Sequence, residues 1–235
     1  MQANRLKKEL PVYLQHDKNA CAATITRSIV EYFEPDIKLE WDTLDSALNR
    51  QAGDTIQGLE HLSYLIGRGY RLTEIGRGYD LERLRTEGFA YLEEFYAVKT
   101  DQPRWVPETF YEYFSTIGSV ERSIQANTEV QELFATYPNY HGIERDPTTA
   151  DVIDFIKDDQ LVIYYGPGSA IGTSHAMLAW DYQEVNGERF ISRFWPHPED
   201  IYNNRVTIGM FEEDFLPSEG IVGVKFLGRQ AIETS

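Results

Sequence analysis

The stretch His175–Trp195, HAMLAWDYQEVNGERFISRFW, decides the fold class of this 235-residue chain. Its two halves, His175–Tyr182 and Arg189–Trp195, are rich in apolar and aromatic residues and flank the dipeptide Asn186-Gly187. Asn-Gly between two such runs is the strongest short-range signal for a β-hairpin, because both residues tolerate the positive φ of a tight turn. We therefore expect two antiparallel strands here.

Regular elements are also expected on either side of this hairpin. Leu161–Tyr165 and Ile221–Leu227 are short apolar runs typical of buried strands. Thr148 and Asp151 have the spacing of a capping box and predict a helix start. The Gly-rich segment Gly166–Thr173 lacks the Lys-Ser/Thr ending of a phosphate-binding loop, so we interpret it as a mobile loop before His175.

The N-terminal part has helical periodicity instead. Apolar residues from Ala22 to Phe33 recur on one helical face, Pro35 ends the pattern, and Asn19 is the expected N-cap. Helices at the front and strands at the back predict an α+β protein. Further helices are expected at Trp41–Arg50, Thr55–Ile66 and Asp80–Thr86, and a further strand at Tyr70–Ile75.

The middle of the chain, at about 88–141, is rich in Tyr and Phe and lacks strong strand punctuation. We interpret it as a mostly helical insert in a single domain that spans residues 1–235. Its aromatic residues are expected in the core; the alternative is a lid or a recognition wall for a peptide.

Composition excludes several function classes. The formal net charge of −16 argues against general nucleic-acid binding, which needs clustered Lys and Arg. No apolar run approaches the ~20 residues of a membrane span, and Met1–Leu10 has no secretory apolar core, so we expect a cytoplasmic protein that does not bind membranes. One cysteine and five scattered histidines predict no disulfide, no metal site and no cofactor.

The one cysteine, Cys21, is the candidate nucleophile. It lies in the first turn of the expected helix, where unpaired backbone amides and the helix dipole favour a thiolate. Gln15, six residues earlier, ends an extended segment and is placed to donate to an oxyanion together with the Cys21 backbone N–H. His175 opens a strand after the Gly-rich loop and is the candidate base. The alternatives are a buried structural thiol, a strand histidine and a polar residue at a strand end.

Other polar residues near these positions are interpreted more simply. His16 and Asp17 lie in the turn before Cys21 and are expected to be solvated. His197 follows the second hairpin strand and is a weaker candidate to line the cleft.

Two segments resemble papain-like peptidases, especially the C39-like group. Gln15–Ala23 (QHDKNACAA) resembles their Gln-x5-Cys start, and Ser174–Tyr182 (SHAMLAWDY) resembles the strand that begins with their histidine. The resemblance covers about Leu10–Pro35 and 148–227. It implies a papain-like fold, with an N-terminal helical part packed on a C-terminal antiparallel sheet, and Cys21, His175 and Gln15 as catalytic residues.

The chain departs from that pattern where an acid or amide should orient the histidine. The family normally has Asp or Asn just after the second hairpin strand, and here Trp195 occupies the position. Asp200 is our candidate orienter; Asn203, a backbone carbonyl or a water molecule are the alternatives.

The expected function is therefore a cysteine hydrolase, a thiol-dependent peptidase or amidase that acts on a peptide or protein substrate. One alternative is a catalytically inactive C39-like domain that binds a peptide. Another is a cysteine-dependent acyltransferase, in which an amine replaces water as the acyl acceptor.

Overall fold

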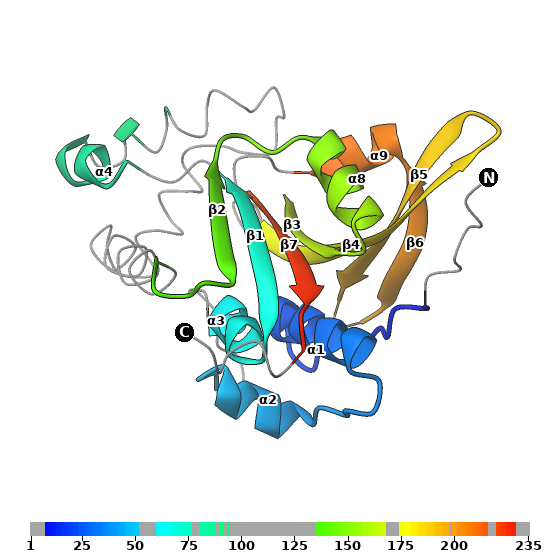
Figure 1. The fold of residues 1–235 in the computed structure, drawn as a ribbon, viewed down its shortest axis with the longest axis horizontal. Coiled ribbons are helices and arrows are strands. Elements are labelled where there is room, and N and C mark those ends of the chain that lie inside the picture. Colours follow the sequence, from blue (N-terminus) through cyan, green and yellow to red (C-terminus); the bar gives the residue numbers. More distant parts are fainter. Residues whose placement is uncertain are drawn as a thin grey trace.

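The computed structural model of the chain describes residues 8–51, 60–76, 80–87, 90, 91, 94, 135–167, 174–197, 199–215 and 220–228. Within them the protein is α+β, as expected, with one seven-stranded sheet between helices on both faces (Figure 1). The described helices are α1 (Cys21–Phe33), α2 (Trp41–Ala47), α3 (Glu60–Gly67), α4 (Leu81–Glu87), α8 (Thr149–Lys157) and α9 (Ile208–Asp214).

The sheet is mixed, in the order β2-β1-β7-β3-β4-β5-β6. Neighbouring strands are antiparallel except β1 and β2, which are parallel. The expectation of a C-terminal antiparallel sheet is thus corrected, because β1 comes from the N-terminal part and pairs with β7. The strands are β1 (Tyr70–Gly76), β2 (Tyr140–Glu144), β3 (Leu161–Pro167), β4 (Ser174–Val185), β5 (Glu188–Pro196), β6 (Ile201–Thr207) and β7 (Ile221–Phe226).

Both faces of the central strands are buried. In β3, Leu161 and Ile163 pack in one hydrophobic cluster with residues of α1, α2 and α3. Val162 and Tyr164, which alternate with them, pack in a second cluster with residues of α8 and α9. Figure 1 shows α1, α2 and α3 on one side of the sheet and α8 and α9 on the other. This two-sided burial explains why the sequence of β3 is a continuous apolar run.

The central hairpin and the capping box are confirmed. β4 and β5 pair across a turn in which Asn186 and Gly187 have φ of 55° and 82°. Thr148 accepts from the backbone N–H of Asp151, whose side chain accepts from the backbone N–H of Thr148. Local chemistry was sufficient to predict both features.

Two edge strands were missed. No strand was expected at the position of β6, and of its residues only Val206 is buried. β2 begins at Tyr140, inside the expected helical insert, and none of its residues is buried. A strand with so few buried side chains lacks the apolar alternation by which strands are predicted. Most of the expected insert lies outside the described residues.

The helix ends also differ from the expectation. The N-cap of α1 is Ala20, which makes no side-chain cap hydrogen bond, so the prediction of Asn19 is wrong. α2 ends at Ala47, before the expected Arg50. α3 is described from Glu60, and the expected helical residues before it lie outside the described ranges.

His61 of α3 is buried without a hydrogen-bond partner. It is 3% exposed, and among the described residues neither ring nitrogen is satisfied. Burial lowers its pKa to about 4. In the unfolded chain the pKa of His61 is near 6.5. On acidification the histidine is therefore protonated in the unfolded state before it is protonated in the folded state. The folded state loses stability as the pH falls from about 6.5 towards 4.

We expect His61→Leu to stabilise the protein and to reduce its acid sensitivity. Removing an unsatisfied buried polar ring should add about 1–2 kcal/mol at neutral pH. At pH 5 the gain should grow by a further ~2 kcal/mol, because the variant has no histidine to protonate on unfolding. Urea unfolding of variant and parent at pH 7.5 and pH 5 measures the gain in unfolding free energy at each pH. Equal acid sensitivity of variant and parent would contradict this account.

In the ranges that the structure describes, no helix is both long and apolar enough to cross a bilayer.

Candidate active site

Cys21 is the first residue of α1, and its sulfur faces β4. Backbone N–H groups of Cys21 and Ala22 at the helix start, and of Ala176 in β4, lie close enough to the sulfur to favour its thiolate. Ala176 directly follows His175. The packing of α1 on the sheet therefore brings the thiol to β4, close to the end of the strand where the candidate base lies.

Burial nevertheless raises the pKa of the Cys21 thiol above its ordinary value. The three backbone N–H groups and the positive charge of Arg50 lower the pKa, but less than burial raises it. The N–H groups at the helix start thus lower the pKa, as expected, but desolvation of the thiolate outweighs them. At neutral pH the residue is a thiol.

His175 is oriented by a backbone carbonyl. Its Nε2 lies 2.5 Å from the carbonyl oxygen of Pro196, the residue after Trp195. A carbonyl oxygen only accepts, so Nε2 carries the proton and Nδ1 holds the lone pair of a base. Burial lowers the pKa of His175, the Pro196 carbonyl raises it, and the charge of His197 lowers it again. The imidazole is neutral at pH 7.

Neither of the named side-chain candidates orients His175. The Asp200 carboxylate accepts from the backbone N–H of Ile201, and the Asn203 side chain accepts from the indole of Trp180. The carbonyl of Pro196, the residue after Trp195, is the group that orients the imidazole. Within the described part of the chain, no hydrogen bond joins the Cys21 sulfur to His175.

Gln15 is buried beside this turn, with 4% of its surface exposed. Its backbone N–H donates to the carbonyl of His197, 3.1 Å away, which ties the entry segment to the end of β5. Its Nε2 donates to the carbonyl of Asp17 at 3.0 Å, while Oε1 is buried and has no partner in the part of the chain that the structure describes. One amide N–H is used inside the turn, and no acceptor for the second is found among the described residues.

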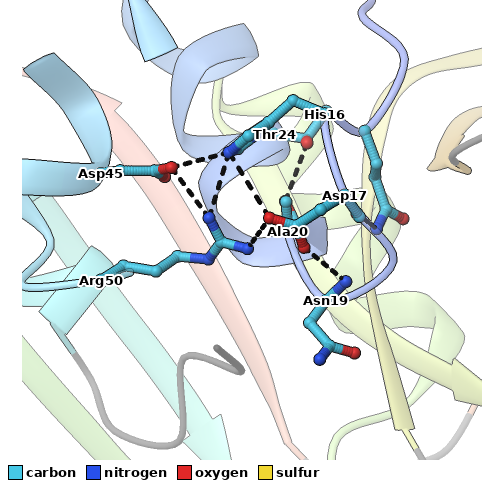
Figure 2. Close-up of polar contacts among 8 residues, drawn as sticks. His16, Asp17, Asn19, Ala20, Thr24, Asp45 and Arg50 are labelled. Atoms are coloured by element: carbon cyan, nitrogen blue, oxygen red, sulfur yellow. Dashed lines mark hydrogen bonds and ion pairs between the residues drawn. The ribbon is translucent and has the colours of Figure 1, made fainter. Parts of the chain in front are cut away.

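The turn before Cys21 is held by a charged network that the sequence did not reveal (Figure 2). His16 Nε2 lies 2.7 Å from Asp45 Oδ2, and the His16 ring stacks on Trp41 at 4.3 Å. Arg50 pairs with both Asp45 and Asp17. His16 and Asp17 are therefore members of a charged cluster, and their side chains, each 20% exposed, are only partly solvated.

A row of rings leads away from His175. Its ring centroid lies 5.9 Å from that of Trp195, which lies 6.0 Å from that of Tyr202, and Tyr202 lies 5.8 Å from His197. Tyr202 is 44% exposed. The outer rings of this row are therefore accessible beside the candidate base.

No family model matches the chain, and no curated protein matches it either. In the described ranges, no group of three or more His, Cys, Asp or Glu side chains is arranged to hold a metal ion. The functional argument therefore depends on the geometry around Cys21.

Proposed function

We propose that the protein is a papain-like cysteine hydrolase, similar to the C39-like group, that acts on a peptide or amide bond of a peptide or protein substrate. The observation that carries the proposal is the meeting of Cys21, at the start of α1, with the backbone of Ala176 beside His175. In such an enzyme Cys21 is the nucleophile, His175 is the base and Gln15 is an oxyanion donor.

The proposed reaction starts from an uncharged pair. The pKa of the Cys21 thiol is raised and the pKa of His175 is lowered, so neither group is ionised at neutral pH. His175 Nδ1 takes the thiol proton as the sulfur attacks the substrate carbonyl. The backbone N–H of Cys21 and the second N–H of Gln15 Nε2 donate to the oxyanion.

Collapse of the tetrahedral intermediate completes acyl transfer. The C–N bond breaks, and His175 returns the proton to the leaving amine, which leaves a thioester on Cys21. Water, deprotonated by His175, then attacks the thioester and releases the acid and the thiol. An amine in place of water gives an acyltransferase by the same steps, and its rate relative to hydrolysis is measured by adding an amine acceptor.

Acylation of Cys21 by a small activated ester, such as p-nitrophenyl acetate, tests the proposal. We expect one acetyl group per chain, located on Cys21 by mass spectrometry, and p-nitrophenolate release well above that of a free thiol at the same pH. Cys21→Ser should lower the rate to the background of the ester. Acetylation only at lysines, with Cys21 unmodified, would contradict a nucleophilic role.

Two observations favour a second candidate, a domain of the same fold that binds a peptide without cleaving it. The pKa of Cys21 is raised by burial, and no hydrogen bond joins the thiol to His175 within the described residues. Such a domain should react with the ester no faster than a free thiol, and removal of His175 should leave that rate unchanged. The ester experiment therefore separates the two candidates.

A further inference from the structure

Arg50 is a buried cation three residues beyond the end of α2. The residue is 6% exposed, although it carries a full charge. Its Nη1 donates to Asp45 Oδ2 at 2.9 Å, and its Nη2 donates to Asp17 Oδ2. A guanidinium so enclosed remains charged because two carboxylates compensate it.

Asp17 connects this cation to the turn that carries the thiol. Its Oδ1 accepts from the backbone N–H of Asn19 at 2.8 Å. Its carbonyl accepts from the Gln15 side chain at 3.0 Å and from the backbone N–H of Ala20 at 3.2 Å. The residue that Arg50 holds therefore fixes the Gln15 amide and the residue before Cys21.

Arg50 also acts on Cys21 by its charge. Its positive charge favours the Cys21 thiolate. Asp17 and Asp45 bind the same guanidinium, and two negative charges beside it reduce the field that it exerts at a distance. His16 lies 2.7 Å from Asp45 (Figure 2). On the sheet side, β4 is the strand that contacts the thiol, and His175 lies at its start.

We propose that Arg50 is a positioning residue for the Cys21 nucleophile: it holds the turn through Asp17 and supplies a positive charge that Asp45 moderates. The description of Cys21 as a nucleophile rests on the proposed function. The effect of Arg50 on the ionisation of the Cys21 thiol does not rest on the proposed function, because this ionisation can be measured without catalytic turnover.

The test uses two variants that break the same ion pair and change the charge in opposite directions. Arg50→Gln removes the cation, and Asp45→Asn removes one of the anions that offset it. The readout is the pH dependence of Cys21 alkylation by iodoacetamide in the full chain, with thermal unfolding as a check on folding. We expect alkylation of Arg50→Gln at neutral pH to be about tenfold slower, and that of Asp45→Asn to be several-fold faster.

A matched control removes an arginine at the other end of α1. Arg68 donates to Glu34, the residue after α1, at 2.9 Å. A helix of 13 residues is ~20 Å long, beyond the range at which a charge acts strongly through salt solution. Arg68→Gln should therefore leave the alkylation profile of Cys21 unchanged.

Opposite shifts in the two variants support the inference. Shifts in the same direction, or no shift in folded variants, would overturn it, because the charge beside the turn would then have no effect on the thiol. If Arg50→Gln does not fold, Asp45→Asn decides alone: faster alkylation supports the inference, and an unchanged or slower rate refutes it. Opposite shifts without acylation by the ester would leave this inference standing and reject the hydrolase.

Discussion

His175→Ala should slow acylation of Cys21 by p-nitrophenyl acetate by about 10³-fold, the range that a general base contributes in a pair of this kind. The expected loss is large because burial holds Cys21 as a thiol, so attack needs a base to take its proton. His175 is prepared for this role, since the carbonyl of Pro196 keeps the proton on Nε2 and leaves Nδ1 free to accept.

The control for this variant is His197→Asn, which changes the other histidine near the row of rings. We expect a change of less than about threefold. Loss of acylation in His197→Asn with normal acylation in His175→Ala would move the base to His197. Equal small effects of both variants would favour the peptide-binding domain.

The pH dependence of wild-type acylation provides a second check on the base. Burial lowers the pKa of His175 from its ordinary value of 6.5, so the imidazole stays unprotonated until the pH falls below 6.5. Acylation should therefore decline only below about pH 6.5 and should be flat between pH 7 and pH 8. A rate that rises tenfold per pH unit across the neutral range would indicate a free thiolate acting without the base.

Local sequence signals predicted the parts of the fold that local chemistry determines. The periodicity from Ala22 to Phe33 predicted α1, and Asn186-Gly187 predicted the central hairpin. The strands β2 and β6 were missed because they form the two edges of the sheet and bury almost nothing. The parallel pairing of β1 with β2 joins segments with more than 60 residues between them and has no local signature.

The sequence predicted that Cys21 lies in the first turn of a helix, but not the electrostatics around it. Cys21 does start a helix, yet the sign of its pKa shift depends on how closely α1 packs against β4. Asp17 and Arg50 lie 33 positions apart, and no pattern connects them. The orienting group of His175 is a backbone carbonyl, which any residue at position 196 would supply.

The carbonyl of Pro196 provides part of what an Asp or Asn side chain at position 195 would provide. An acid or amide side chain orients a catalytic histidine and stabilises the imidazolium that forms during the reaction. The carbonyl of Pro196 provides the orientation and a hydrogen bond but carries no negative charge. In the proposed enzyme, the imidazolium of His175 would therefore be stabilised less well by this carbonyl than by a carboxylate.

Gln15→Glu should lower the rate of Cys21 acylation by about 10²–10³-fold, the cost of losing one oxyanion donor. The substitution keeps the size of the side chain, which is 4% exposed, and replaces its donor by an acceptor. A carboxylate there repels the oxyanion and also the carbonyl of Asp17, to which Gln15 Nε2 donates. The effect should appear in the acylation rate, with a smaller change in the pH at which the rate declines.

Gln160→Glu is a matched control for this change. Gln160 is 5% exposed, its Nε2 donates to the Asp158 carboxylate, and among the described residues its Oε1 is also buried without a partner. It follows α8, which packs on the face of the sheet opposite to α1. The control therefore also buries a carboxylate beside an acceptor but should acylate Cys21 at the parent rate. Equal losses in both variants would show that Gln15 contributes only to folding, and would remove it from the proposed oxyanion site.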